Sequence, residues 1–322
     1  MKKENGETSS AKATCFGELL VDMIATNTGS LENSEGFLKK FGGAPANTAA
    51  DLAKLGVPVR FMGKVGDDPF GHFLKGVLDE NGVDTDSLIL SKTEKTTLAF
   101  VSLTESGERD FTFYKGAHEA IGPSEVNLPE NTSLFHFGSL TQTNEAANQA
   151  TNKLIDQARA VNAIISYDPN IRESLWGDLN KATEIILATA KKVDILKLNE
   201  DEARILSGKN DISEAGKSLF TDNLEAIFVT VGKEGCYYKT KQNEGFVPVP
   251  IKVDPIDTTG AGDAFNAGYI FAINESQKRV SQMSKDELET ALKRANIIAA
   301  LTTTKKGAID ACPSPEDLKQ YI

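Results

Sequence analysis

The chain has 322 residues, which at roughly 150 residues per domain predicts about two structural units. Hydrophobic residues make up 40% and charged residues 25%, as in an ordinary globular protein whose core needs no disulfide or metal support. The 46 acidic and 35 basic residues give a net charge of −11, which argues against nucleic acid as a partner because such binding depends on neutralised phosphates.

The three cysteines, Cys15, Cys236 and Cys312, lie far apart and form no C-x-x-C pair. This spacing indicates neither a disulfide framework nor a zinc site, and predicts buried thiols in a reducing compartment. Residues 1–12 are polar and lack the apolar stretch of a signal peptide, so they predict a loose tail. No apolar run approaches the ~18 residues of a membrane span. We therefore expect a cytoplasmic protein with no membrane partner.

Strand-like apolar runs alternate with helical patterns along most of the chain. The expected strands are Ala13–Ile24, Val59–Val65, Leu134–Phe137, Ala163–Tyr167, Asp194–Leu198 and Ala226–Val231. The expected helices are Pro45–Leu55, Pro69–Glu80, Glu145–Val161, Leu179–Lys191, Ser213–Phe220 and Ala264–Phe271. This alternation is typical of a mostly parallel sheet with helices on both faces, so the sequence predicts a three-layer α/β/α fold.

Two regions depart from this alternation. The segment 97–115 contains two strand patterns with no helix between them, and its second half alternates so that Phe111 and Phe113 share one face. Such a pattern predicts a β-hairpin that projects from the main sheet. The segment 19–41 also lacks a helical pattern and is a candidate to pair with that hairpin. We therefore expect one α/β domain over 13–322 that carries a small β-sheet.

The segment 257–265, DTTGAGDAF, is the most informative motif. Gly260 and Gly262 allow a tight bend, so that the N–H groups of Gly260, Ala261 and Gly262 point outward at the start of a helix and form an anion hole. Asp263 in the same turn suits a general base that takes a hydroxyl proton. The competing interpretation is an ordinary turn whose aspartate caps a helix, and this segment alone leaves both open.

Two further glycine clusters follow the same logic. Gly42 and Gly43 permit close backbone approach to a ligand, and Asn47 offers both a donor and an acceptor. In isolation, a loop followed by proline in the first helical turn is the favoured interpretation of this cluster. A third cluster follows an apolar strand, where ligands of open α/β sheets bind, and it contains Thr230, Gly232 and Gly235.

The order of the motifs carries more information than any one of them. In chain order they are GELLVDM at 17–23, GGAPAN at 42–47, DPNIR at 168–172, NEDE at 199–202, TVGKEG at 230–235, DTTGAGDAF at 257–265 and ANIIAALTTTKKGA at 295–308. Over residues 13 to 320 this series resembles the ribokinase-like (PfkB-type) carbohydrate kinase family, and within it the fructokinases. The resemblance implies a ribokinase-like fold in which the small sheet is a lid over the sugar and a surface for a homodimer.

The resemblance also implies an ATP-dependent reaction in which a sugar hydroxyl attacks the γ-phosphate. It makes Asp263 the base and the backbone of Gly260, Ala261 and Gly262 the anion hole. The residues that it implies for the sugar are Asp22, Gly42, Gly43 and Asn47, with Arg172 reaching sugar or phosphate. Those that it implies for ATP are Asn199, Thr230, Gly232, Gly235 and Asn296. Glu202, with Asn199, would organise Mg²⁺ through waters, and K⁺ is expected between the loops that contain Asp257, Thr259, Thr302 and Gly307.

The identity of the sugar depends on the end of the hairpin. Sugar-acid kinases of this family tend to carry Tyr and Arg there to hold a carboxylate, whereas this chain has Phe113-Tyr114-Lys115. Without a guanidinium the capture of a carboxylate weakens, which favours a neutral sugar, fructose, phosphorylated at a primary hydroxyl. The alternatives are a 2-keto-3-deoxygluconate kinase and a ribokinase-type kinase. A different class of protein, a catalytically silent ribokinase-like binding protein, would have little reason to keep Asp263.

Overall fold

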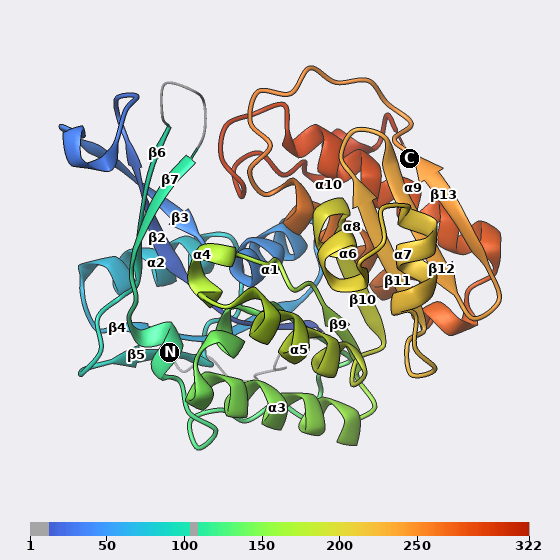
Figure 1. The fold of residues 1–322 in the computed structure, drawn as a ribbon, viewed down its shortest axis with the longest axis horizontal. Helices are drawn as coiled ribbons and strands as arrows, with labels where there is room; N and C mark the ends of the chain where they lie inside the picture. The colour runs from blue at the N-terminus through green and yellow to red at the C-terminus, as the bar shows by residue number, and fades with distance from the viewer. Residues whose placement is uncertain (1–12, 104–108, 322) are drawn as a thin grey trace, which may run out of the picture.

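The computed structural model describes residues 13–103 and 109–321, so the tail predicted at 1–12 lies outside the described part. The described residues form a large sheet covered by helices and a small second sheet that projects from one end (Figure 1). Within those residues, no helix combines the length and the apolar character that crossing a membrane requires.

The large sheet is mostly parallel. Its described strands are β1 (Ala13–Phe16), β4 (Val59–Gly66), β5 (Leu88–Ser91), β8 (Leu134–Phe137), β9 (Ile164–Tyr167), β10 (Ile195–Asn199), β11 (Ala226–Val231), β12 (Gly235–Thr240) and β13 (Glu244–Pro248). They lie in the order β13-β12-β11-β10-β9-β8-β1-β4-β5. Strands from β5 to β11 pair in parallel, whereas β12 and β13 add an antiparallel edge.

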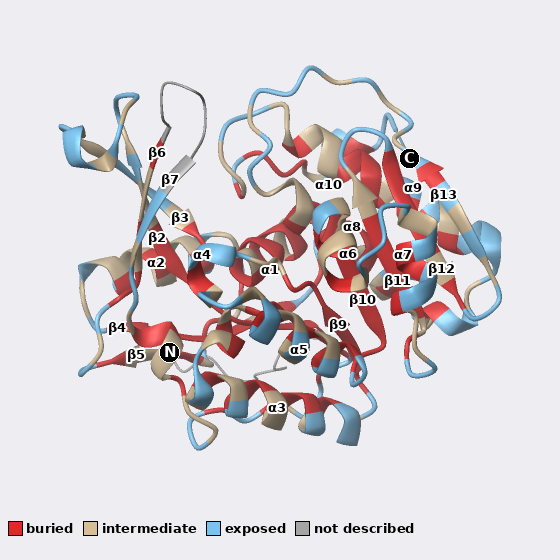
Figure 2. Cartoon of the chain, viewed as in Figure 1, coloured by how far each residue is buried: buried red, intermediate tan, exposed pale blue. Residues whose placement is uncertain are grey.

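Helices cover both faces of this sheet, as the alternation predicted. One face packs against α1 (Ala44–Lys54), α2 (Pro69–Glu80), α8 (Ala261–Ser276) and α9 (Lys285–Thr302). The other face packs against α3 (Glu145–Ala160), α5 (Leu179–Ala190), α6 (Glu200–Ser207) and α7 (Ile212–Leu219). Each face has its own apolar core, and Figure 2 shows buried strands between helices whose outer sides are exposed. The predicted three-layer α/β/α fold is confirmed.

The prediction of a single strand over Ala13–Ile24 is wrong. The chain leaves the large sheet after β1 and enters the small sheet as β2 (Leu20–Ala25). Gly17 lies between them, packed so closely on Pro45 that a Cβ would lie 2.5 Å from the proline Cγ. An apolar run reads the same whether it serves one sheet or two, so the pattern did not reveal this break. The β12–β13 hairpin and helix α9 were also not predicted.

The small sheet joins the two regions that lacked helical patterns. It contains β3 (Phe37–Gly42), β2, β6 (Leu98–Leu103) and β7 (Arg109–Tyr114), in the order β3-β2-β6-β7. The predicted shared face of Phe111 and Phe113 is confirmed, because their rings stack with centroids 6.2 Å apart. The register pairs Asp22 with Ala99 and Ala99 with Phe113, so this is also the face that carries Asp22.

Three aromatic rings hold the start of α8 against the sheet. Phe228 of β11 meets Phe265 and Tyr269 of α8 with ring centroids 6.5 and 5.2 Å apart, and all three side chains are buried. Such edge-to-face contacts add to the stabilisation that comes from burying large apolar area. The first turns of α8 are therefore fixed at the carboxyl ends of β10 and β11.

Truncating Phe228 should destabilise the whole domain. We expect Phe228→Ala to lower the free energy of unfolding by about 3–5 kcal/mol, because it leaves a cavity between sheet and helix. Phe246→Ala is the matched control, because Phe246 on β13 of the same sheet is 47% exposed and its truncation should lower the free energy of unfolding clearly less. Guanidinium chloride unfolding measures both variants, and equal losses would contradict a special role for the Phe228 cluster.

Candidate active site

Asp263 lies in the first turn of α8, and α1 packs beside it (Figure 1). Its Oδ2 accepts a hydrogen bond of 2.8 Å from Nδ2 of Asn47, and its backbone oxygen accepts one of 3.4 Å from Thr48. The residue is only 8% exposed. The structure therefore brings the predicted base and a predicted sugar-binding residue into direct contact.

The environment of Asp263 moves its titration close to neutral pH. Burial raises its pKa to about 7, and the hydrogen bond from Asn47 opposes this. The carboxylate of Asp168 raises the pKa further, whereas the charges of Lys197 and Arg172 lower it. A carboxyl group with a pKa near 7 can accept a proton from a substrate more readily than an ordinary aspartate.

The turn before Asp263 bends tightly at Gly260. Gly260 adopts a left-handed conformation with φ of 79°, and a Cβ there would lie 2.5 Å from Cβ of Ala308. Only glycine fits these two conditions together. Helix α8 then begins at Ala261, whose N–H donates to the carbonyl of Thr258 at 3.3 Å. One of the three N–H groups assigned to the anion hole is thus engaged within the turn.

The other residues predicted for the sugar lie where β2, β3 and the start of α1 meet. A side chain at Gly42 would collide with the carboxylate of Asp22, so these two residues are in contact across β2 and β3. Gly43 has φ of 118°, and a side chain there would collide with the carbonyl of Glu18. Oδ1 of Asn47 is buried and has no hydrogen-bond partner among the described residues. It is an acceptor that a ligand hydroxyl could satisfy.

Arg172 follows β9 and precedes the short helix α4 (Glu173–Trp176). Its guanidinium is close enough to lower the pKa of both Asp263 and Glu18. Glu18 is buried, accepts a hydrogen bond of 2.9 Å from the N–H of Ala44, and has a pKa that burial raises to about 7. The charge of Arg172 therefore acts on both buried carboxyl groups, and an anion near them would be attracted to it.

The residues predicted for ATP lie at the ends of β10, β11 and β12. Thr230 is the next-to-last residue of β11 and donates to the carbonyl of Leu198 at 3.3 Å. Gly232 lies in the following turn, and Gly235 begins β12. Asn296 lies on α9, where its amide donates to the carbonyl of Val247 at 2.9 Å. In this structure Asn296 is thus a buried link between α9 and β13.

Asn199 and Glu202 form a reciprocal cap at the start of α6. Oδ1 of Asn199 accepts from the N–H of Glu202 at 2.9 Å, and Oε2 of Glu202 accepts from the N–H of Asn199 at 2.8 Å. Oε1 of Glu202 accepts from Ile171 at 2.6 Å. Both carboxylate oxygens are therefore engaged with backbone, so this pair suits Mg²⁺ that keeps its waters. In the described part of the chain, no three His, Cys, Asp or Glu side chains are grouped to hold a metal directly.

The loops predicted for K⁺ are joined by Asp257. Its two carboxylate oxygens each accept a hydrogen bond of 3.0 Å, one from the N–H of Thr259 and one from the N–H of Gly307. The N–H of Asp257 donates to the carbonyl of Thr303. Thr302 is buried and donates to the carbonyl of Ile298 at 2.9 Å. The two loops therefore lie side by side and present several oxygen atoms.

Sequence reasoning did not single out three polar residues beneath Asp263. Lys197 and Asp168 form a buried ion pair of 2.9 Å, and Asn266 donates to the same Asp168 oxygen at 2.7 Å. The available signals were a lysine inside the otherwise apolar strand β10, an aspartate just after β9, and an asparagine one turn after Asp263 on α8.

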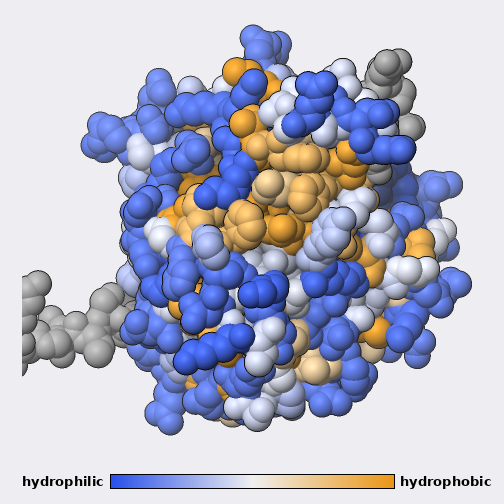
Figure 3. Space-filling model, turned by 90° about the vertical axis from the view of Figure 1, so that its left-hand side faces the viewer, coloured by the Kyte–Doolittle hydropathy of each residue, from blue (hydrophilic) through white to orange (hydrophobic). Residues whose placement is uncertain are grey.

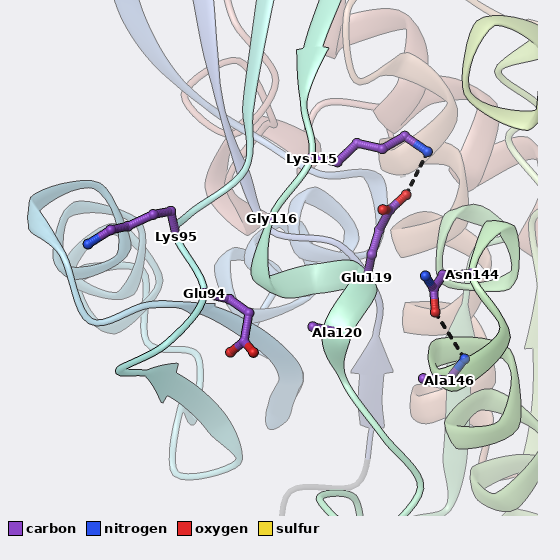
Figure 4. Close-up of a pocket in the computed structure, with 8 residues that line it drawn as sticks. All are labelled: Glu94, Lys95, Lys115, Gly116, Glu119, Ala120, Asn144 and Ala146. Carbon is purple, nitrogen blue, oxygen red and sulfur yellow. Dashed lines mark hydrogen bonds and ion pairs between the residues drawn. The ribbon is translucent and has the colours of Figure 1, made fainter.

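A separate cavity of about 470 Å³ lies where β6 and β7 leave the main domain (Figure 4). Among its lining residues, Lys115 forms an ion pair of 2.7 Å with Glu119, and Asn144 accepts from the N–H of Ala146. The cavity does not include Asp263, so it is a feature of the base of the small sheet. It shows that Lys115, at the position that suggested a neutral sugar, is already paired with a carboxylate.

Comparison with known proteins places this site in a family. The model of the pfkB family carbohydrate kinase matches residues 10–316. "Probable fructokinase-2" of Arabidopsis thaliana is 40% identical over 328 aligned residues, which cover 100% of this chain and 98% of that protein. The fructokinase of Xylella fastidiosa with bound ATP superposes with a TM-score of 0.86 at 30% identity, covering 96% of this chain and 98% of that one.

A double mutant of the Vibrio cholerae O395 fructokinase, bound to fructose, ADP and a potassium ion, also superposes with a TM-score of 0.86 at 30% identity. The alignment covers 97% of this chain and 98% of that one. The chain belongs to the pfkB family of carbohydrate kinases. The fold and the enzyme class expected from the motif order are thereby confirmed.

The titration of Asp263 can be measured without any substrate. With ¹³C-labelled aspartate side chains, the Asp263 resonance is the one that disappears in Asp263→Asn. We expect it to titrate at about 7, because burial penalises the ionised form. A midpoint near the ordinary aspartate value of about 3.9 would show that the carboxyl is well solvated in the free protein.

Proposed function

We propose that this carbohydrate kinase transfers the γ-phosphate of ATP to a primary hydroxyl of fructose. The observation that carries the proposal is the 2.8 Å hydrogen bond that joins Asp263, directly after the Gly260–Gly262 turn, to Asn47 of the helix that follows Gly42 and Gly43. The choice of fructose is supported by the names of the relatives that match the chain over its whole length.

In the proposed reaction, Asp263 accepts the proton of the sugar hydroxyl as its oxygen attacks the γ-phosphorus. The bond to the bridging oxygen of ATP breaks, and ADP leaves with that electron pair. The N-terminus of α8 stabilises the negative charge on the transferred group. Asp22 and Asn47 orient the sugar, and the small sheet excludes water that would otherwise accept the phosphoryl group. When bound, Mg²⁺ would neutralise phosphate charge, with Asn199 and Glu202 orienting its waters.

A coupled assay of ADP release on fructose, 2-keto-3-deoxygluconate and ribose tests the substrate. We expect fructose to have the highest kcat/KM. A higher value for 2-keto-3-deoxygluconate would overturn the fructose assignment and point to Lys115 and Arg172 as carboxylate ligands, whereas a higher value for ribose would indicate a ribokinase-type enzyme. A folded protein that releases no ADP with any sugar would favour the silent binding protein.

Asp263→Asn tests the proposed base. The amide nearly preserves shape but cannot accept the proton, so we expect kcat to fall roughly 10²- to 10⁴-fold. ATP binding, measured by calorimetry, should change little because the phosphate donors are backbone groups. Asp286→Asn is the control, since Asp286 also lies in the first turn of a helix, α9, but is exposed. A variant that keeps more than about a third of the wild-type kcat would reject Asp263 as the base.

A monovalent cation is part of the proposal. One relative binds potassium, and Asp257, Thr259, Thr302 and Gly307 bring oxygen atoms of two loops together beside the turn. By tying these loops, K⁺ would hold the Gly260–Gly262 turn in place before the reaction. We expect K⁺ to raise kcat several-fold over tetramethylammonium at equal ionic strength, which removes screening as the cause. Equal rates in the two salts would indicate that Lys305 or the loops alone serve this purpose.

We also propose a homodimer that forms through the small sheet. Exposed apolar side chains lie on both of its faces, and Figure 3 shows an apolar patch on this end of the molecule. These side chains are Ile24, Leu38, Phe111 and Tyr114. We expect light scattering to give twice the chain mass of 34.7 kDa, and Leu38→Lys to give the single-chain mass. A wild-type mass of one chain at assay concentration would reject the dimer.

We also propose that the enzyme is cytoplasmic. The support for this proposal is that Cys15, Cys236 and Cys312 are all free and buried, as expected for a reducing compartment.

A further inference from the structure

Lys197 is a cation buried among carboxylates. It lies on β10 between Leu196 and Leu198, and only 4% of it is exposed. Its ammonium forms the 2.9 Å ion pair with Asp168, whose side chain is 5% exposed. Taking two charges out of water costs several kcal/mol per ion unless further interactions compensate. Such a pair needs a reason beyond stability, since an apolar pair would fill the same space at lower cost.

The position of the ammonium suggests that reason. A Cβ built on Gly262 would lie 3.1 Å from Nζ of Lys197, so the charge lies directly against the turn that begins α8. Asn266, one turn further along α8, donates to the Asp168 oxygen that also accepts from Lys197. One ion pair therefore joins β10, the loop after β9 and the first two turns of α8.

We propose that Lys197 is an electrostatic positioning residue of the phosphoryl-transfer site, acting through the Gly260–Gly262 turn and Asp263. Its ammonium supplies a fixed positive charge behind the backbone donors of that turn and beside the carboxylate of the base. This inference rests on the proposed function for its effect on the reaction, but its effect on Asp263 exists in the free protein.

The charges around Asp263 agree with this role. Facing it are Asp51 from α1, Asp168 and Arg172 from the segment after β9, and Lys197 from β10. Arg172 is exposed and largely screened by water, whereas Lys197 is buried, where charges interact strongly. Burial alone would lower the pKa of Lys197, but the charges of Asp168, Glu202 and Asp263 raise it, so the lysine stays charged.

The competing explanation is that Lys197 only neutralises Asp168 and keeps the segments packed. The two explanations predict different changes in the pKa of Asp263. If Lys197 acts electrostatically on Asp263, removing its positive charge must raise the pKa of Asp263, and removing the negative charge of Asp168 must lower it. A purely structural pair gives no reason for opposite shifts, because either substitution breaks the same contact.

The decisive measurement is the ¹³C titration of Asp263 in the protein without sugar or nucleotide. We expect the pKa to rise by about one unit in Lys197→Met and to fall by about one unit in Asp168→Asn. Lys64→Met is the matched control, because Lys64 is a buried, ion-paired lysine on β4 that contacts Glu94 and Glu125 instead. It should leave the Asp263 titration unchanged. Shifts in the same direction, or none in Lys197→Met, would overturn the proposal.

Near-UV circular dichroism establishes that each variant is folded. Should Lys197→Met fail to fold, Lys197→Arg and Asp168→Asn carry the test. The arginine keeps the charge and should hold the Asp263 pKa near the wild-type value, while Asp168→Asn still predicts the downward shift. An electrostatic role would be rejected if the pKa of Asp263 rose in Lys197→Arg as is predicted for Lys197→Met. It would also be rejected if that pKa did not fall in Asp168→Asn.

Kinetics then tests the consequence for the reaction. We expect Lys197→Met to lower kcat about 10- to 10³-fold, as for loss of one charge-stabilising group, with KM for sugar and ATP changed much less. A higher KM for sugar or ATP with an unchanged kcat would contradict the positioning role of Lys197. If the wild-type enzyme turns over no sugar, the proposed function fails while the titration result still stands, so the two failures are distinguishable.

Discussion

The hydrogen bond between Asn47 and Asp263 is the contact on which the site depends. It joins the first turns of α1 and α8, which the large sheet brings together from distant parts of the sequence. Each turn is preceded by a glycine in a conformation that other residues rarely adopt, Gly43 before α1 and Gly260 before α8. The two glycine motifs are therefore halves of one structure, in which two helix starts face each other across a buried carboxyl group.

The polar layer beneath this contact explains why the site tolerates so many buried charges. Asp168 lies between Lys197 and Asn266, and further along the sheet the Ser166 hydroxyl bridges His136 and Tyr269. Burial lowers the pKa of His136 to about 4, so it adds no positive charge at neutral pH. Lys197 is thus the buried cation of the described part of the site, and the carboxylates around it depend on it.

Much of the fold could be predicted because alternating apolar runs mark a parallel sheet directly. The strand at Ala226–Val231 and the helix at Pro69–Glu80 have the predicted ends, the latter because Asp68 caps it and Pro69 begins it. The break after Phe16 could not be predicted, because it depends on Pro45 packing against Gly17 from a helix far along the chain. The local pattern of apolar residues does not reveal such a contact.

The site was predictable to the extent that its residues carry unusual backbone or motif chemistry. Asp263, Gly260 and Gly43 stand out for that reason. The importance of Lys197 and Asp168, in contrast, comes from the residues that they contact in the folded protein. Lys197 was visible as a lysine in an apolar strand, but sequence alone does not say which carboxylate pairs with it. Partners brought together by the fold are the part of a site that sequence leaves open.

Three buried carboxyl groups make the stability of the folded protein depend on pH. Burial raises the pKa of Glu18 and Asp263 to about 7, and raises that of Asp51, which lies against the Cys312 thiol. An acid whose pKa is raised by folding favours the folded state when protonated. For Glu18 and Asp263 that contribution is complete below about pH 4 and is lost as the pH rises toward 7. At neutral pH the folded protein therefore gives up stability at the atoms where the proposed reaction needs a base. The core that holds α8, with Phe228, Phe265 and Tyr269, supplies the rigidity that makes this loss tolerable.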